Sequence, residues 1–457
     1  MNGLDQARDK MLAAEVHPRA VDVFAAFYAQ LESGATGLIH EAEVDPLDGL
    51  PHAGDLMVAD DEARAAAAQT VVIKLNGGLG TSMGLDRAKT LLPVRPGLSF
   101  LDVIVGQVRH VRQTHDVRLP LLFMNSFRTR DDTLAALDAY PDLAVGRLPL
   151  DFLQSSEPKL RQDDLTPVEW PADPSLEWCP PGHGDLYTAL QTSGILQQLI
   201  AEGYRYATVS NADNLGAAPS PQMMGWFAAS GAPYAAEVCR RTPADVKGGH
   251  LVVRRSDGRL VLRETAQTAP DDAELAADPT RHRYFHTNNL WFDLIALNDL
   301  LTERDGVMGL PLIRNLKTVD PSDPTSTPVV QIESAMGAAV EVFEGATAIE
   351  VDRSRFLPVK TTNDLLLLRS DVYGVGVDHL VRAQVDPPLI DLDRRFFTTI
   401  ADFDARIPSP PSLVDARSLT VRGDWRFGRD VVVTGDVMLD DHTTAQSVAA
   451  GTHLTGG

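Results

Sequence analysis

The chain has 457 residues, of which 44% are hydrophobic and 23% are charged, a globular composition with room for two or three hydrophobic cores. Its formal net charge of -22 at pH 7, with no basic run, disfavours binding to nucleic acid or to an anionic membrane. No stretch approaches the roughly 18 apolar residues that a membrane span needs, and the first residues lack the pattern of a secretory signal.

Two cysteines, Cys179 and Cys239, are too few for a disulfide framework or a structural zinc site. We therefore predict reduced thiols and a cytoplasmic protein. The composition gives no indication of the oligomeric state.

Residues 1–69 show helical periodicity, interrupted by acidic connections that contain proline. The stretch "VDVFAAFYAQL" places four residues on one side of a helix: Val21, Phe24, Ala25 and Tyr28. We predict a helical N-terminal extension over residues 1–69.

Residues 70–386 alternate between short apolar strands and amphipathic helices. The predicted strands cover residues 70–76, 119–126, 149–156, 205–214 and 234–241. The predicted helices cover residues 99–114, with Ser99 as N-cap, 129–140, 183–203 and 329–343, and a strand followed by a helix covers 354–373. This alternation predicts an α/β domain of Rossmann-like type, with a mixed, mostly parallel sheet and ligands at the carboxyl ends of its strands.

Residues 387–457 differ in character and follow the pattern of β structure. "PSPPS" at 408–412 is typical of a linker. Beyond it, "VRGD" and "VTGD" recur twelve residues apart, in segments that alternate apolar and polar residues. We predict a small C-terminal β domain, formed either by a hairpin or by the coils of a short β-helix.

The stretch "VVIKLNGGLGTSMG" ends an apolar strand in a cluster of glycines: Gly77, Gly78, Gly80 and Gly84. Their spacing does not match the dinucleotide-binding fingerprint, and the last glycine is followed by leucine instead of the lysine of a P-loop. A glycine turn with only a structural role is one interpretation. The other is a loop whose backbone approaches a nucleotide, with Lys89 folded back over the phosphates. Only seven of the 41 basic residues are lysine, which favours a specific role for Lys89.

Seven motifs occur in order between residues 71 and 373: "LNGGLGTSMG", "AKTLLPV", "PPGHGDLYTAL", "VSNADNLGA", "VKGGHLV", "FHTNNLWF" and "SRFLPVKTTNDLLLLRSDVY". Together they resemble the UDP-glucose pyrophosphorylases of the eukaryotic type. Gly80-Thr81-Ser82 stands where related pyrophosphorylases have Gly-Thr-Arg, and this difference favours the glucose family over the N-acetylhexosamine family.

The resemblance implies roles for the charged residues of these motifs. Lys89 would contact the β- and γ-phosphates of UTP, and Lys360 would lie beside the α-phosphate and the sugar phosphate. Asp213 would bind Mg²⁺, which prefers hard oxygen ligands. The residues alone also allow Lys360 to be an edge lysine with its ammonium in water, and Asp213 to be a turn cap.

The resemblance also implies a nucleotide site and a sugar site. The residues expected to bind UTP are Leu75, Asn76, Gly77, Gly78, Gln154, Gly182 and His183. Those expected to bind the sugar are Asn211, Gly249, Glu264, Asn288 and Asn289. His183 is not assigned proton transfer, because the attacking sugar phosphate already carries a nucleophilic oxygen.

The implied activity is the reversible formation of UDP-glucose and pyrophosphate from UTP and glucose 1-phosphate, by in-line attack at the α-phosphorus. One alternative is a UDP-sugar pyrophosphorylase acting on galactose 1-phosphate or N-acetylglucosamine 1-phosphate. The other is a non-catalytic nucleotide-sugar-binding protein, since a fold does not determine an activity. His250 and His286 depart from the family pattern, and we expect both to flank the sugar pocket.

Overall fold

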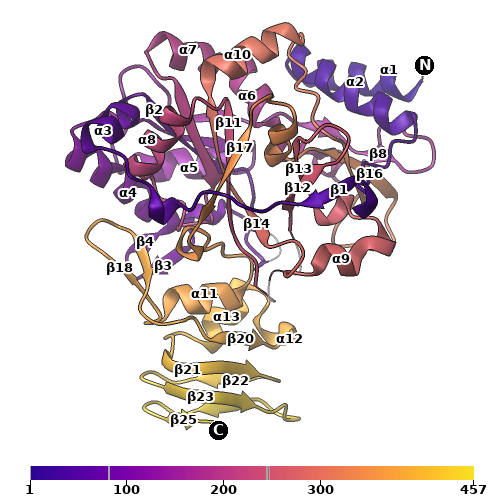
Figure 1. The fold of residues 1–457 in the computed structure, drawn as a ribbon. Coiled ribbons are helices and arrows are strands. Elements are labelled where there is room, and N and C mark those ends of the chain that lie inside the picture. The colour runs from indigo at the N-terminus through magenta and orange to yellow at the C-terminus, as the bar shows by residue number, and fades with distance from the viewer. Residues whose placement is uncertain (1, 81–82, 243–244, 246–247, 457) are drawn as a thin grey trace.

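The computed structural model describes residues 2–80, 83–242, 245 and 248–456, and shows an α/β body with a stack of short strands below it (Figure 1). The body contains a seven-stranded sheet in the order β17-β11-β14-β10-β2-β5-β6. Its strands are β2 (Thr70–Asn76), β5 (Leu121–Asn125), β6 (Asp151–Leu153), β10 (Tyr206–Asn211), β11 (Tyr234–Arg240), β14 (Tyr284–Asp293) and β17 (Thr347–Val351). Strand β14 is antiparallel to its neighbours β10 and β11, and the other pairings of this sheet are parallel. The predicted mixed, mostly parallel sheet is therefore confirmed.

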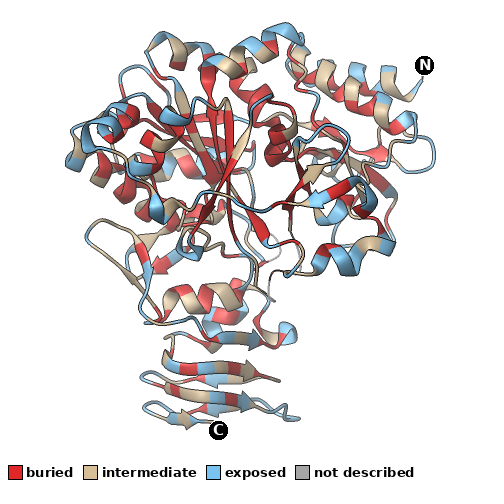
Figure 2. Ribbon diagram, in the orientation of Figure 1, coloured by how far each residue is buried: buried red, intermediate tan, exposed pale blue. Residues whose placement is uncertain are grey.

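Helices cover both faces of this sheet. They are α3 (Asp60–Ala68), α4 (Phe100–His115), α5 (Arg130–Leu137), α6 (Leu186–Thr192), α7 (Ile195–Ala201), α8 (Pro221–Ser230) and α10 (Leu294–Glu303). Because side chains alternate along a strand, Val71 and Ile73 of β2 join the buried cluster that includes α6 and α7, whereas Val72 joins the cluster that includes α4 and α8. The central strands are accordingly buried on both faces (Figure 2).

Helix α4 begins where the sequence predicts. The Ser99 hydroxyl accepts the backbone N–H of Asp102 at 3.2 Å, and the Asp102 carboxylate accepts the backbone N–H of Ser99 at 2.7 Å. This reciprocal capping satisfies two donors that the first turn would otherwise leave unpaired.

Three predicted elements differ from the structure. The helix predicted over 183–203 is divided into α6 and α7, because Gly194 has a left-handed conformation with φ of 75°. The helix predicted over 329–343 is wrong: strand β16 (Pro328–Glu333) precedes a 3₁₀ helix, Met336–Glu341. The strand predicted before α11 (Thr362–Arg369) is a 3₁₀ turn followed by one isolated bridge, between Pro358 and Asn214.

The N-terminal helices α1 (Gly3–Ala13) and α2 (Pro18–Glu32) pack onto the body and belong to its core. Met11 and Phe24 lie in the same buried cluster as the sheet residue Val71. Strand β1 (Val44–Pro46) extends this association, since it pairs with β12 (His250–Arg254), which pairs with β13 (Leu260–Arg263). The first 69 residues are therefore helical for the most part but also contribute a strand.

The remaining elements of the body connect these layers. Its remaining short strands are β3 (Pro93–Arg95), β4 (Leu98–Ser99), β7 (Glu157–Pro158), β8 (Leu160–Arg161), β9 (Trp178–Cys179), β15 (Ile313–Thr318), β18 (Tyr373–Val375) and β19 (Val381–Ala383), and its remaining helix is α9 (Ala273–Ala277). Strands β8, β15 and β16 form a small antiparallel sheet.

The C-terminal region consists of one strand, two short helices and then further strands, and its strand pairings are parallel. The elements are β20 (Leu389–Leu392), α12 (Arg394–Phe397), α13 (Ile400–Arg406), β21 (Ser412–Val421), β22 (Trp425–Phe427), β23 (Val432–Leu439), β24 (Gln446–Val448) and β25 (His453–Thr455). Strand β21 pairs in parallel with β23, so these two strands do not form a hairpin. Leu419 lies opposite Val437, a separation of 18 residues, and the twelve-residue recurrence of the sequence is therefore not the structural repeat.

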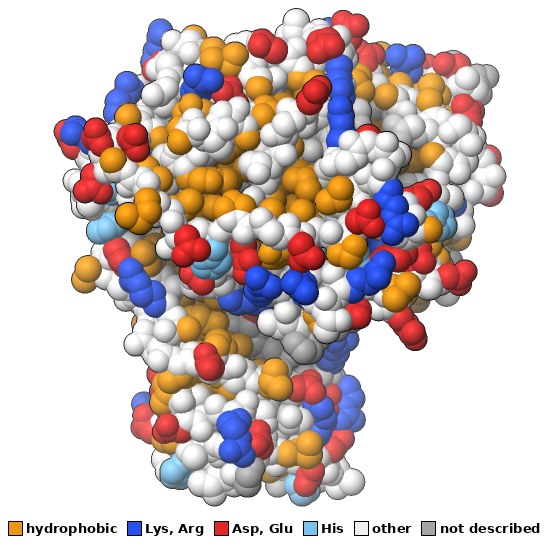
Figure 3. All heavy atoms as spheres, viewed as in Figure 1, with side chains coloured by type: hydrophobic (Ala, Val, Ile, Leu, Met, Phe, Trp, Pro, Cys, Tyr) orange, Lys and Arg blue, Asp and Glu red, His pale blue; other side chains and the backbone are white. Residues whose placement is uncertain are grey.

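Within the described ranges, no helix is long and apolar enough to cross a membrane. On the face in Figure 3, acidic and basic side chains are interspersed around a central hydrophobic area.

Candidate functional site

A cavity of about 290 Å³ opens at the carboxyl ends of β2 and β10. The predicted catalytic, nucleotide and metal residues all line it: Leu75, Asn76, Gly77, Gly78, Lys89, Gln154, Gly182, His183, Asp213 and Lys360. Thr90, Met124, Pro180, Asn211 and Ala212 complete the lining. Thr81 and Ser82 of the glycine loop, and Val246 and Lys247 of the "VKGGHLV" motif, lie outside the described residues.

Three charged side chains converge in this cavity. The ammonium groups of Lys89 and Lys360 both donate to Oδ2 of Asp213, each at 2.9 Å. Burial acts to raise the pKa of the Asp213 carboxyl, but the two ammonium groups outweigh it, so the pKa is lowered. Asp213 is therefore an anion clamped between two cations.

The second oxygen of Asp213 is the place where a metal ion fits this site. Oδ1 is buried and has no hydrogen-bond partner. A buried carboxylate oxygen without a partner is costly unless a cation or donor binds it. The described part of the chain holds no cluster of three His, Cys, Asp or Glu side chains suited to a metal ion, so a cation here would take its other ligands from substrate and water.

The glycines around the cavity leave room for a close approach of backbone to ligand. A side chain at Gly77 would lie 2.7 Å from Oε1 of Gln154, whereas Gly78 faces open space. Gly182 has φ of 78°, and a side chain there would lie 2.6 Å from the carbonyl oxygen of Ser334. Gly182 is therefore restricted to glycine by its conformation and its packing, whereas a side chain at Gly77 would displace the end of Gln154.

Asn76 lines the cavity, but its side chain is hydrogen-bonded to neighbouring parts of the protein. Its amide donates to Asn125 Oδ1 and to Thr133 Oγ1, both at 2.8 Å, and its carbonyl oxygen accepts the Thr90 hydroxyl at 2.9 Å. The side chain of Asn76 thus joins β2 to its neighbours, and both of its amide hydrogens are engaged.

His183 is a hydrogen-bond donor in this cavity. Its Nδ1 accepts the backbone N–H of Met336 at 2.9 Å. Burial, assisted by the charge of Lys360, lowers the pKa of His183 to about 4. The neutral ring therefore carries its proton on Nε2 and is unsuited to act as a base near neutral pH.

A larger cavity of about 760 Å³ adjoins the first, and Asn211 and Lys360 line both. Four of the residues predicted to bind the sugar line it: Asn211, Gly249, Glu264 and Asn288. Burial raises the pKa of Glu264 to about 7. This cavity therefore offers amide and carboxyl groups for the hydroxyls of a sugar, next to the lysines.

Two expectations about this cavity are corrected. Asn289 does not line it: its amide donates to Glu237 Oε2 at 3.0 Å, and its side-chain oxygen accepts from Asn214 at 3.1 Å. His286 lines the cavity, but His250 packs against His282 with ring centroids 4.5 Å apart. The buried Glu237 carboxylate binds the Asn289 amide, whereas Asn288, which has φ of 57°, lines the cavity beside His286 and Thr287.

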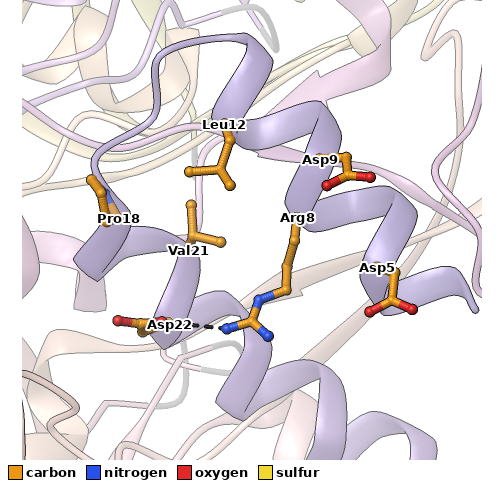
Figure 4. Close-up of a pocket in the computed structure, with 7 residues that line it drawn as sticks. All are labelled: Asp5, Arg8, Asp9, Leu12, Pro18, Val21 and Asp22. Carbon is orange, nitrogen blue, oxygen red and sulfur yellow. Dashed lines mark hydrogen bonds and ion pairs between the residues drawn. The ribbon is translucent and has the colours of Figure 1, made fainter.

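A separate hollow between α1 and α2 contains none of the motif residues (Figure 4). It is lined by Asp5, Arg8, Asp9, Leu12, Pro18, Val21 and Asp22. Arg8 pairs with Asp22 at 3.4 Å, and both side chains are largely exposed.

Comparisons with known proteins place the chain in a family. A family profile described as UTP–glucose-1-phosphate uridylyltransferase matches residues 22–434. The chain is 40% identical over 376 residues to the UTP–glucose-1-phosphate uridylyltransferase of Saccharomyces cerevisiae, over 80% of this chain and 73% of the yeast protein.

Solved structures show the same likeness over the whole chain. The crystal structure of a UDP-glucose phosphorylase from Trypanosoma brucei is 40% identical, with a TM-score of 0.92 over 100% of this chain and 98% of that one. A mutant UDP-glucose pyrophosphorylase from Leishmania major, in complex with UDP-glucose, is 40% identical, with a TM-score of 0.93 over 100% and 99% of the two chains. The chain therefore belongs to the UTP–glucose-1-phosphate uridylyltransferase family.

Proposed function

We propose that the chain makes UDP-glucose and pyrophosphate from UTP and glucose 1-phosphate, the activity of its family. The observation that carries the proposal is the clamp of Lys89, Asp213 and Lys360, where the nucleotide cavity meets the sugar cavity. Positive charge is concentrated there in a chain whose net charge is -22. Two anionic substrates that meet at this point need such a concentration.

The reaction is a single displacement at phosphorus. A phosphate oxygen of glucose 1-phosphate attacks the α-phosphorus of UTP, and the bond from that phosphorus to the oxygen bridging to the β-phosphate breaks. Pyrophosphate leaves with the bridging oxygen and its electron pair. The chain contributes position and charge: Lys89 toward the β- and γ-phosphates, and Lys360 toward the α-phosphate and the sugar phosphate.

Asp213 has a second part in this proposal, as the ligand of Mg²⁺ through Oδ1. Bound Mg²⁺ supplies positive charge that offsets the charge of the phosphates. Asp213→Asn keeps the size of the side chain and removes its charge, so we expect turnover to fall by roughly 100-fold or more. Turnover is measured across a Mg²⁺ titration, and an active variant with unchanged Mg²⁺ dependence would contradict the metal role.

The proposed nucleotide site includes Gln154 and the backbone at Gly78 and Gly182 around the uracil. Asn211, Gly249, Glu264 and Asn288 would bind the sugar. A pyrophosphate-release assay with UTP, ATP and GTP, and with the 1-phosphates of glucose, galactose and N-acetylglucosamine, tests both sites. We expect UTP with glucose 1-phosphate to be used best, because a purine would clash and leave polar groups unpaired. Preference for another sugar 1-phosphate would change the proposed substrate. Binding of the substrates without release of pyrophosphate would indicate a non-catalytic protein.

The domain organisation and location belong to the same proposal. We infer an N-terminal extension (1–69), a Rossmann-like catalytic domain (70–386) and a β-helix-like domain (387–457). The parallel pairings of the central sheet and of β20, β21, β23 and β25 support these names. The free, buried thiols of Cys179 and Cys239 support a cytoplasmic location.

A further inference from the structure

A buried polar network lies between the central sheet and the segment 353–360, which we call the strap. At its centre is Glu237 on β11, whose side chain is fully buried. Oε1 accepts from Arg355 Nη2 at 2.8 Å and from Trp291 at 2.9 Å, and Oε2 accepts from Arg355 Nε at 2.8 Å and from Asn289 at 3.0 Å. The carboxylate is therefore satisfied by four bonds, two of them from one guanidinium in bidentate geometry.

The same network holds the backbone of the strap. The peptide carbonyl of Arg355 accepts the side-chain amides of Asn214, at 3.1 Å, and Asn289, at 3.2 Å. Asn214 also accepts the backbone N–H of Leu357 at 2.8 Å. Asn214 directly follows Asp213 in the chain, so the turn that carries the clamped carboxylate is joined through Asn214 to the strap at Arg355 and at Leu357.

Besides these bonds, the strap is held by the ion pair of Arg353 with Asp245 at 2.6 Å and by the backbone N–H of Val359, which donates to the Asp213 carbonyl at 3.3 Å. Its only regular pairing among the described residues is the isolated bridge between Pro358 and Asn214. It ends at Lys360, whose ammonium reaches Asp213 at 2.9 Å although its side chain is 57% exposed. A long, exposed side chain reaches one position reproducibly only when the backbone that carries it is held.

We propose that Glu237 and Arg355 are a positioning pair, which holds the strap so that Lys360 reaches the reacting phosphates. Neither side chain lines the two substrate cavities, so the pair acts through Lys360 and not by contact with substrate. The inference rests on the proposed function, since it concerns the same reaction.

A double-mutant cycle tests this dependence. Glu237→Gln leaves the Arg355 charge buried with a weakened partner, and we expect the turnover number to fall by about tenfold or more, because small displacements of a reacting group are costly. In a Lys360→Ala background the same substitution should change turnover by less than about threefold, because coupled effects are not additive. The KM for UTP should change little in both backgrounds. Equal losses in the two backgrounds would overturn the proposal.

A second variant separates positioning from stability. The paired substitution Glu237→Met with Arg355→Met removes both charges, and such replacements often leave stability unchanged or increased. We expect this variant to fold, as judged by its thermal midpoint, and still to show the low turnover of Glu237→Gln. Turnover restored together with stability would show that the pair has only a structural role.

Asp293→Asn provides the matched control at the other end of the sheet. Asp293 accepts from Arg205 Nε at 2.9 Å and caps α10, far from the strand ends that carry the site. Its substitution should lower stability and leave the turnover number unchanged. A wild-type chain that releases no pyrophosphate would refute the proposed function itself, whereas normal turnover of Glu237→Gln refutes only the positioning role.

Discussion

Lys89 and Lys360 come from distant parts of the chain, and their ammonium groups both donate to the same oxygen of Asp213. When phosphates arrive, both ammonium groups have anionic partners beyond Asp213. Lys89→Ala should weaken the binding of UTP and of pyrophosphate. It should leave the binding of UDP-glucose nearly intact, because this product lacks the β- and γ-phosphates of UTP. We expect the free energy of binding UTP or pyrophosphate to become less favourable by about 2–4 kcal/mol. Equilibrium binding of each ligand measures this change.

Lys360→Ala should behave differently, because its proposed partners are the groups between which the bond forms. An interaction that is strongest in the transition state appears in turnover more than in affinity. We therefore expect the turnover number to fall in both directions, which corresponds to an activation barrier raised by about 2–4 kcal/mol. Lys360→Arg should restore little of the lost turnover. Steady-state kinetics, forward and reverse, measure this, and normal turnover of Lys360→Ala would contradict the placement.

His286 makes the stability of the chain depend on pH. Burial lowers its pKa to about 4, so between pH 6.5 and 4 the unfolded chain binds a proton there that the folded chain does not. This favours the folded state above pH 6.5, and the contribution is lost as the pH falls to 4. His286→Asn lacks this titration. The unfolding free energy of the wild type, relative to the variant, should therefore fall by about 3 kcal/mol between pH 7 and 4.

Urea unfolding at several pH values measures this difference, so that other titrating groups cancel. A difference that stays constant from pH 7 to 4 would show that His286 is not buried as a neutral ring.

At the scale of elements, the N-terminal cap of α4 contributes measurably to the stability of the chain. Ser99→Ala removes the hydroxyl that accepts the N–H of Asp102, and we expect the free energy of unfolding to fall by about 1 kcal/mol. Thr114→Ala, in the last turn of the same helix, is the control and should change it by less than about 0.5 kcal/mol. Equal effects of the two substitutions would mean that Ser99 does not cap the helix.

Two of the elements that the sequence predicted wrongly share one physical cause. Residues 329–333 have apolar residues at helical spacing, yet they form β16, because β15 on one side and β8 on the other pair with their backbone. The strap was predicted as a strand, but the backbone N–H of Leu357 bonds to a side chain of the neighbouring turn instead. Local periodicity contains neither of these partners.

At the scale of the whole molecule, the C-terminal strands share a hydrophobic core with the body. Leu413 and Leu419 of β21 lie in the same buried cluster as Phe100 of α4. We therefore expect one cooperative thermal transition, with equal calorimetric and van't Hoff enthalpies. A separate transition at lower temperature, absent from a chain that ends before β21, would show that the C-terminal strands unfold independently.

The sequence by itself predicted the central strand-and-helix alternation and the cap at Ser99, and it singled out motif residues that line the smaller cavity, because these depend on short-range patterns. Only the tertiary structure decided that Asn289 bonds to Glu237 and does not line the larger cavity, that His250 packs against His282, and that Glu237 and Arg355 form a network. The motif "SRFLPVK" contains Arg355, but its partners lie on β11 and β14, more than 60 residues away in the chain. Such roles arise from contacts between distant segments, which form only when the sheet assembles.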